Sequence, residues 1–182
     1  MRCAGLAFLM LVLAVGLTGC AAGGKVLYRV NCGDTKEYVD QAGDKWLPDQ
    51  DFKEGAQYGA VGGLTITRTG LTVGCPRAPH VFITEHYSMS KYQFAVPNGK
   101  CAVRLYFCET YSGITKAGER VFTVKVQGKE ALKDLDVLKE AGGFAKPLVK
   151  DVRDVAVTDG KLVIEFVPKV QNPEINGIEI LQ

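Results

Sequence analysis

Three tyrosines occupy positions where strand-like runs of the sequence give way to polar turns, and their rings are the chain's best candidates for binding chemistry. Tyr58, Tyr87 and Tyr111 are each followed by a glycine or a serine. A tyrosine ring offers apolar faces together with a hydrogen-bonding hydroxyl, and binding residues collect on loops that a rigid scaffold holds in place. Several such rings on one rim would suit a flat, hydroxyl-rich ligand such as a sugar. The alternative is that each ring packs over the base of its own loop, and both interpretations stay open at this point.

The groups needed for bond cleavage are poorly represented. A hydrolase needs a positioned acid and base, and the chain has two histidines, His80 and His86, the first of them in a proline-flanked turn. A glycosidase uses two carboxylates across a cleft, for which Glu85, Glu109 and Asp51 are the candidates. Acidic residues at strand ends are, however, usually solvated or bound to backbone amides, and the sequence has no Gly-x-Ser-x-Gly motif. We therefore expect that the protein is not an enzyme.

Metal and nucleic-acid binding are also disfavoured. Asp49-Gln50-Asp51 resembles the start of a calcium loop, but Lys53 stands where that pattern requires another Asp or Asn. No Cys-x-x-Cys motif or Cys/His pairing has the spacing of a zinc site. The formal net charge is +2, and Lys and Arg are interspersed with Asp and Glu, so the sequence lacks the basic stripe typical of nucleic-acid binding. We expect no metal, no cofactor and no nucleic-acid partner.

A segment near the N-terminus has the pattern of an export signal. The run from Ala4 to Leu17 is apolar but shorter than the ~20 residues that span a membrane, as in the core of a signal peptide. It ends in Leu17-Thr18-Gly19-Cys20, which resembles the signal of a bacterial lipoprotein, whose cysteine is acylated and becomes the mature N-terminus. We expect an exported protein of the bacterial cell envelope, lipid-anchored to a membrane through Cys20; the alternative is a plain secretory signal with an unmodified Cys20. The expected organisation is a signal peptide over residues 1–19, a lipidated cysteine with a short tether over 20–25, and one domain over 26–182.

Four cysteines remain in the expected domain, and an exported chain can form disulfides. Cys101 and Cys108 lie on one predicted strand, on opposite faces and roughly 23 Å apart, so they cannot pair with each other. Cys75 stands in a Gly-Cys-Pro turn and is the best candidate for a bridge, with Cys101 as its possible partner. Cys32 and Cys108 are surrounded by apolar residues and are expected to be buried thiols.

The elements that must position these residues are predicted to be strands. Period-two alternation recurs along the chain, with turn signals at short intervals, and Pro97-Asn98-Gly99 has the composition of a hairpin turn. A break in the alternation favours a bulge near Asp154, and residues 136–141 are expected to form one helical turn. With 182 residues, of which 47% are hydrophobic, the chain is expected to form one all-β domain. The predicted fold is an antiparallel β-sandwich of the jelly-roll or galactose-binding-like lectin type. The alternating sets are Tyr92, Phe94 and Val96; Val103, Leu105 and Phe107; Phe122, Val124 and Val126; and Leu162, Ile164 and Phe166.

The order and spacing of several motifs resemble the malectin domain family over nearly the whole of the expected domain. These motifs are Tyr28-Arg29-Val30-Asn31-Cys32-Gly33, Tyr58-Gly59, Thr84-Glu85-His86-Tyr87, the run from Val103 to Tyr111, Arg120-Val121-Phe122-Thr123-Val124, and the run from Asn172 to Ile180. The resemblance implies a β-sandwich lectin that recognises glucose-containing oligosaccharides and has no catalytic activity of its own.

The resemblance also implies which residues meet the sugar. The ligand-contacting aromatic residues of the family map onto Tyr58, Tyr87 and Tyr111. Gln171 and Asn172, with nearby backbone groups, are expected to hold sugar hydroxyls.

Two positions depart from the animal members of the family. Ser112 replaces a second aromatic residue, and Gln171 replaces an acidic residue. The first change removes stacking area, and the second removes charge-assisted hydrogen bonds, which are about twice as strong as neutral ones. The alternative function is therefore a protein-interaction or assembly module that keeps the β-sandwich and has lost the sugar site.

Overall fold

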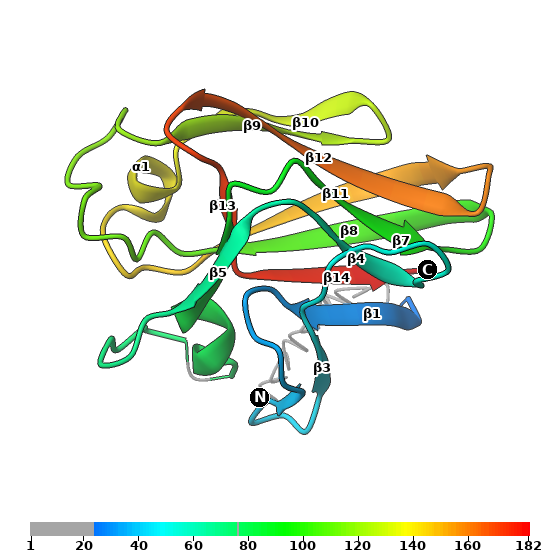
Figure 1. Cartoon of the computed structure of the whole chain (residues 1–182), viewed down its shortest axis with the longest axis horizontal. Helices are drawn as coiled ribbons and strands as arrows, with labels where there is room; N and C mark the ends of the chain where they lie inside the picture. The colour runs from blue at the N-terminus through cyan, green and yellow to red at the C-terminus, as the bar shows by residue number, and fades with distance from the viewer. Residues whose placement is uncertain (1–23, 76) are drawn as a thin grey trace, which may run out of the picture.

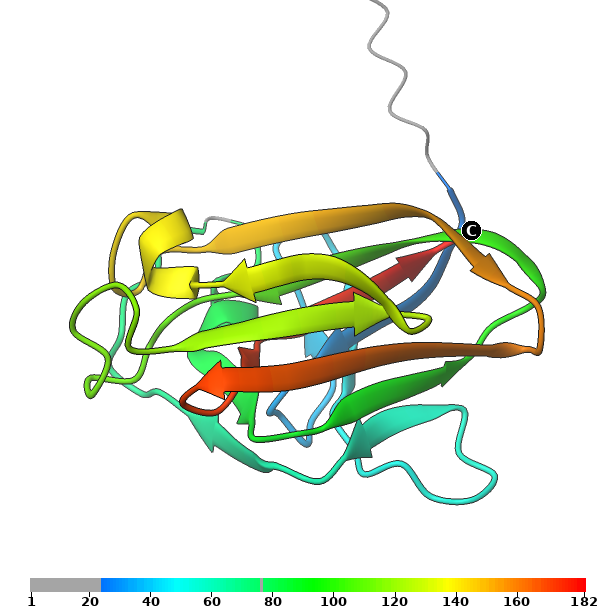
Figure 2. The ribbon, with the colours of Figure 1, turned by 90° about the horizontal axis from the view of Figure 1, so that it is seen from above.

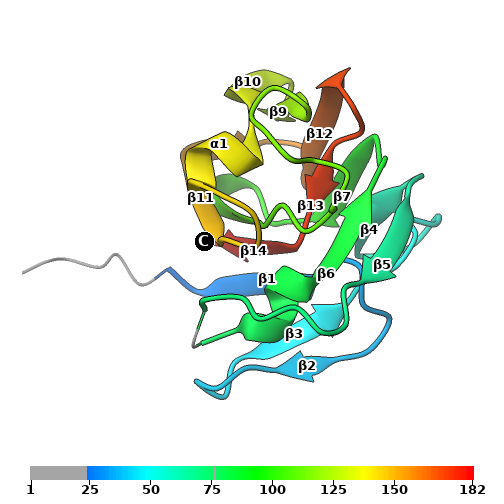
Figure 3. The same cartoon turned by 90° about the vertical axis from the view of Figure 1, so that its left-hand side faces the viewer.

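Two large β-sheets face each other and a small third sheet connects them (Figure 1, Figure 3). The computed structural model describes residues 24–75 and 77–182. The expected signal peptide and Cys20 lie outside these residues. Within them, no helix is both long and apolar enough to cross a membrane.

The largest sheet has six strands in the order β11-β8-β14-β1-β3-β2. Its neighbouring strands are antiparallel, except that β1 and β3 run parallel. The strands are β1 (Val26–Asn31), β2 (Tyr38–Val39), β3 (Lys45–Pro48), β8 (Gly99–Phe107), β11 (Leu148–Val157) and β14 (Gly177–Leu181).

The other two sheets are antiparallel. The five-stranded sheet has the order β10-β9-β12-β7-β4 and the three-stranded sheet the order β13-β6-β5. The chain passes from β12 through β13 to β14, so it visits all three sheets in turn. The five-stranded sheet contains β4 (Tyr58–Val61), β7 (Lys91–Ala95), β9 (Val121–Val126), β10 (Lys129–Leu135) and β12 (Lys161–Val170). The small sheet contains β5 (Leu64–Thr67), β6 (Thr84–Tyr87) and β13 (Glu174–Ile175).

The core lies between the two large sheets, where the alternating apolar faces meet. On β8 every second side chain from Cys101 to Phe107 is buried, and β9 and β12 show the same alternation. The Phe107 and Phe122 rings meet across the core at a centroid distance of 6.1 Å. Burying one such side chain stabilises the fold by ~1.5–3 kcal/mol. The predicted antiparallel β-sandwich is confirmed.

Two local predictions are also confirmed. The register between β11 and β8 shifts between Val152 and Val155, and Asp154 has a φ of 56°, so the bulge lies where the alternation breaks. The helical turn is α1 (Val137–Ala141). Its N-cap residue, Asp136, accepts a hydrogen bond from the Lys139 amide at 3.0 Å, as short N-capping side chains do.

The predicted hairpin at Pro97-Asn98-Gly99 is wrong. β7 pairs with β12 and β4, whereas β8 pairs with β11 and β14, so the turn carries the chain from one large sheet to the other. Phe94 and Leu105 are both fully buried in the same core. The apolar sides of the two strands therefore face each other across the core instead of pairing edge to edge.

The predicted Cys75–Cys101 disulfide is also wrong, because both cysteines are free. Cys101 is buried in the main core, while Cys75 packs on a separate small cluster that includes Phe82 and Cys108. The buried thiols expected at Cys32 and Cys108 are confirmed, since both residues are fully buried.

The first and last strands of the fold are neighbours. Val26 pairs with Leu181, and the backbone N–H of Gln182 donates to the Lys25 carbonyl at 2.9 Å. Figure 2 shows the start of β1 beside the C-terminus, at the end of the sandwich opposite to α1.

Candidate functional site

A cavity of about 310 Å³ opens where the small sheet meets the segments that follow β8 and β12. Four of the residues predicted to bind ligand line it, although they come from distant parts of the chain. They are Tyr87, Tyr111, Gln171 and Asn172. The structure therefore brings these four residues together at one cavity.

Tyr87 is held by strand pairing on both sides. It is the last residue of β6 and lies opposite Leu64 of β5 and Glu174 of β13. Ser88, which follows, has a φ of 63° and turns the chain away. Because the backbone of Tyr87 is fixed in the middle of a sheet, its partly exposed ring has a defined position on the cavity wall.

Tyr111 is held by local hydrogen bonds in the turn after β8. Its backbone N–H donates to Glu109 Oε1 at 3.0 Å, and its carbonyl accepts from the Ile114 N–H at 3.0 Å. The side chain is 42% exposed. The guanidinium carbon of Arg68 lies 5.5 Å from the ring centroid, which is within the range of a cation–π contact.

Gln171 and Asn172 lie in the turn that leaves β12. Gln171 has a φ of 58°, a left-handed conformation that Gln rarely adopts. The Asn172 carbonyl accepts a hydrogen bond from Arg120 Nη1 at 2.8 Å. The turn is therefore tied to the cavity floor, and both of its residues line the cavity together with the tyrosines.

The rest of the lining was not predicted as part of a binding site. It consists of Ile66, Arg68, Glu85 and Arg120. From the sequence, Glu85 is a candidate only for a catalytic carboxylate. Arg120 stands in one of the family motifs, but nothing in the local sequence around either arginine indicates that it pairs with Glu85 or Glu109.

The cavity floor contains a dense group of charges. Arg120 Nε lies 2.7 Å from Glu109 Oε2, and both side chains are at least nine-tenths buried. Arg68 Nη2 lies 3.6 Å from Glu85 Oε2, and Glu85 Oε2 also accepts from Thr110 Oγ1 at 3.0 Å. Glu85 and Glu109 thus each have an arginine as their neighbour.

Glu174, a third acidic residue close to this group, has no such pairing partner among the described residues. It is fully buried, and neither of its carboxyl oxygens has a hydrogen-bond partner among the described residues. Burial raises its pKa well above the usual range, Glu85 adds to this effect, and Arg120 opposes it. Burial likewise raises the pKa of Glu109, against the effect of Arg120. The neutral form of Glu174 is the one that this environment favours.

Tyr58 does not belong to the cavity, so its predicted place on the rim is wrong. Its side chain is buried beneath β4, where the ring stacks on Phe94 at a centroid distance of 6.2 Å. Its hydroxyl donates to the Pro48 carbonyl at 2.8 Å. The ring faces the core because Tyr58 pairs with Phe94 in the sheet.

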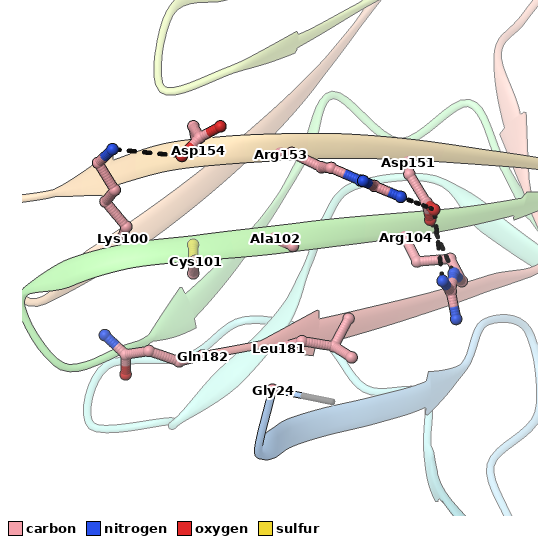
Figure 4. A pocket seen from close by; sticks show the side chains of 10 residues that line it. All are labelled: Gly24, Lys100, Cys101, Ala102, Arg104, Asp151, Arg153, Asp154, Leu181 and Gln182. Carbon is pink, nitrogen blue, oxygen red and sulfur yellow. Dashed lines mark hydrogen bonds and ion pairs between the residues drawn. The ribbon is translucent and has the colours of Figure 1, made fainter. Parts of the chain in front are cut away.

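A larger hollow, of about 510 Å³, lies near the opposite end of β8 (Figure 4). Its lining contains no aromatic residue, and its charged side chains largely neutralise one another. Arg104 Nε lies 2.7 Å from Asp151 Oδ1, and Lys100 Nζ lies 3.2 Å from Asp154 Oδ1. The smaller cavity combines aromatic faces with amide groups and is the better candidate site despite its size.

The described residues contain no group of three or more His, Cys, Asp or Glu side chains arranged to hold a metal ion. His86 belongs to β6 of the small sheet, but Asp49 Oδ2 contacts its Nδ1 at 2.6 Å and the Gly62 carbonyl contacts its Nε2 at 3.0 Å. Both ring nitrogens are engaged within the protein.

The fold and the cavity define a β-sandwich domain with a binding-type pocket at one end. Residues 26–178 match the malectin domain family. The chain belongs to this family.

Two curated relatives match most of this chain. The chain is 30% identical over 190 residues to the probable receptor-like protein kinase At5g38990 of Arabidopsis thaliana, a match that covers 87% of this chain and 21% of the kinase. It is 25% identical over 185 residues to Malectin-B of Xenopus laevis, covering 92% of this chain and 63% of that protein. The chain thus spans about a fifth of the length of the plant kinase.

Solved structures show the same fold. A β-glucuronidase from Bacteroides uniformis matches with a TM-score of 0.77 at 22% identity, covering 85% of this chain and 18% of the enzyme. The plant receptor FER, in complex with LLG2 and the peptide RALF23, matches with a TM-score of 0.73 at 24% identity, covering 85% of this chain and 48% of the receptor chain. At these identities the likeness concerns the fold alone.

Proposed function

We propose that this domain binds a glucose-containing oligosaccharide non-covalently in the 310 Å³ cavity, at the outer side of a bacterial membrane to which an acylated Cys20 tethers it. One observation carries the proposal: two partly exposed tyrosines from two segments and two amide residues from a third segment line one cavity. Membership of the malectin domain family supports the choice of ligand.

The binding mechanism uses ring faces and polar groups together. Tyr87 and Tyr111 offer apolar surface to the C–H side of a pyranose, and Gln171 and Asn172 exchange hydrogen bonds with its hydroxyls. An aromatic contact contributes ~0.5–1.5 kcal/mol beyond the area it buries. With few such contacts in a small cavity, we expect affinity in the micromolar-to-millimolar range, about −8 to −4 kcal/mol.

The proposed tether directs the cavity away from the membrane. Gly24 lines the hollow near the start of β8, whereas Tyr111 follows the end of that strand. A strand of this length extends for about 30 Å. Four residues from Cys20 to Gly24 reach at most ~14 Å, so the end opposite to the cavity would face the lipid.

Calorimetric titration of the purified protein with maltose and other short α-glucans tests this function. We expect saturable binding that Tyr87→Ala abolishes. A blank glycan array for the folded wild-type protein, with no heat from any glucan, would refute the proposal.

A protein-interaction module is the second candidate, and the edge of the small sheet favours it. Leu64 is 62% exposed on β5, the edge strand next to Tyr87, and exposed edges can pair with another chain. The FER complex with RALF23 and LLG2 shows this fold in a receptor that binds proteins. Binding of an extended peptide that Leu64→Lys prevents, together with a blank glycan array, would select this second function.

A further inference from the structure

The Tyr111 ring lies directly against Gly113. A Cβ atom placed on Gly113 would be 2.5 Å from Cε1, 2.6 Å from Cζ and 2.8 Å from the hydroxyl oxygen of Tyr111. Carbon atoms in contact prefer ~3.5–4.0 Å. The ring can occupy its observed position only because residue 113 has no side chain.

Arg68 also contacts the ring. Its guanidinium carbon lies 5.5 Å from the ring centroid, and Arg68 itself lines the cavity. Glu85 holds this guanidinium through the 3.6 Å ion pair. Gly113 is not part of the cavity lining, so it contacts the ring from outside the cavity.

We propose that Gly113 is a positioning residue of the ligand site: the space left by its missing side chain sets where the Tyr111 ring stands and how wide the cavity is. A methyl group at position 113 must displace the ring by roughly 1 Å to restore normal contact. The ring then shifts on the cavity wall and changes the width of the cavity, or it leaves the wall. The consequence for ligand affinity rests on the saccharide function proposed above, whereas the ring displacement does not.

We expect alanine at position 113 to have little effect on the stability of the fold. The atoms that would clash belong to the end of a partly exposed side chain and not to the backbone. Gly113 also lies outside the left-handed region of backbone conformation that penalises other residues. Replacing such a glycine by alanine restricts the unfolded chain and leaves stability unchanged or slightly higher.

The test compares Gly113→Ala with Gly74→Ala in the full protein. Gly74 is a matched control, because its Cβ would meet open space and its φ is also outside the left-handed region. We expect Gly113→Ala to weaken glucan binding by about three- to tenfold with an unchanged melting temperature, and Gly74→Ala to bind like the wild type. Wild-type affinity in Gly113→Ala would overturn the inference.

A double-mutant cycle tests whether Gly113 acts through Tyr111. If it does, Gly113→Ala has no further effect on affinity once Tyr111→Ala is present, because the two changes remove one interaction. An equal loss in both backgrounds would show that Gly113 acts by another route and would overturn the inference.

A ligand-independent measurement separates this inference from the proposed function. The guanidinium group of Arg68 lies near the Tyr111 ring. The NMR chemical shift of its Nε–H proton therefore reports the position of the ring through the ring current. We expect this resonance to shift in Gly113→Ala and to stay in place in Gly74→Ala. If the wild type binds no glucan but the shift occurs, the saccharide function fails and the positioning role stands; if the resonance does not move, the positioning role fails.

Discussion

Glu109 and Arg120 form a buried ion pair of 2.7 Å that joins the two turns bearing the predicted ligand-binding groups. Glu109 accepts a hydrogen bond from the Tyr111 N–H, and Arg120 donates to the Asn172 carbonyl. The geometry of the cavity wall therefore depends on a pair of residues whose charges are shielded from water.

Removing one partner of this pair is expected to destabilise the protein strongly. Arg120→Leu leaves the Glu109 carboxyl buried without its cation, a change that costs about 3–5 kcal/mol in comparable buried pairs. It also frees Asn172, so sugar affinity should fall. Urea denaturation measures the first effect. Surface-exposed Lys100→Leu is the control, with an expected change below ~1 kcal/mol because exposed pairs contribute little; an equally small effect of Arg120→Leu would contradict the role of the pair.

Glu174 is expected to make stability decrease as the pH rises. Its folded-state pKa lies well above the unfolded value, which is about 4.3. The folded protein therefore retains a proton that the unfolded chain releases, so this stabilisation is complete below the unfolded pKa and is lost as the pH rises through the folded pKa.

Glu174→Gln separates this effect from other titrations. The amide has nearly the same shape and no charge, so the variant should show a weaker decline of unfolding free energy between pH 5 and pH 8. Denaturant titrations at several pH values provide the measurement. An identical slope in wild type and variant would mean that Glu174 is ionised in the folded state.

Tyr87→Ala is expected to abolish measurable glucan binding and leave the melting curve nearly unchanged. The Tyr87 ring is partly exposed on the cavity wall, and its removal leaves the strand pairing of β6 intact. Calorimetry and thermal unfolding report the two properties separately. A large fall in melting temperature would show that the ring supports the fold instead.

Tyr58 should show the opposite behaviour. Tyr58→Phe removes the hydrogen bond to Pro48 and should cost about 1 kcal/mol, while Tyr58→Ala also leaves a void in the core and should cost about 3 kcal/mol or more. Chemical denaturation measures both, and glucan affinity of the folded Tyr58→Phe protein should match the wild type. A selective loss of affinity in Tyr58→Phe would return this residue to the binding site.

The contrast between Tyr58 and Tyr87 shows what the sequence could predict. The alternating pattern identified the buried faces of the strands, because every second side chain of a strand points to the same face of the sheet, whichever strands pair with it. It did not identify which strands pair, so the turn at residues 97–99 was misassigned as a hairpin. Tyr58 and Tyr87 both stand at strand termini beside small residues, and only their sheet partners distinguish a core position from a cavity wall.

The charged part of the site was predicted least well. Arg68 contacts Tyr111 and Glu85, while Arg120 contacts Glu109 and Asn172. These partners come together only when three sheets are assembled, and no periodicity within one strand encodes them. The aromatic and amide positions were found because the motifs around them resemble a family with a known arrangement.

The hydrogen bond between Gln182 and Lys25 has a consequence for how such a domain could be built into a longer polypeptide. The first and last residues of the domain lie side by side, far from Tyr111. A domain with neighbouring ends can be inserted into another polypeptide through two short linkers. Neither connection would pass over the cavity. Such geometry suits a module whose match covers about a fifth of a plant receptor-like kinase, and it favours fusion of a reporter after Gln182, away from the cavity.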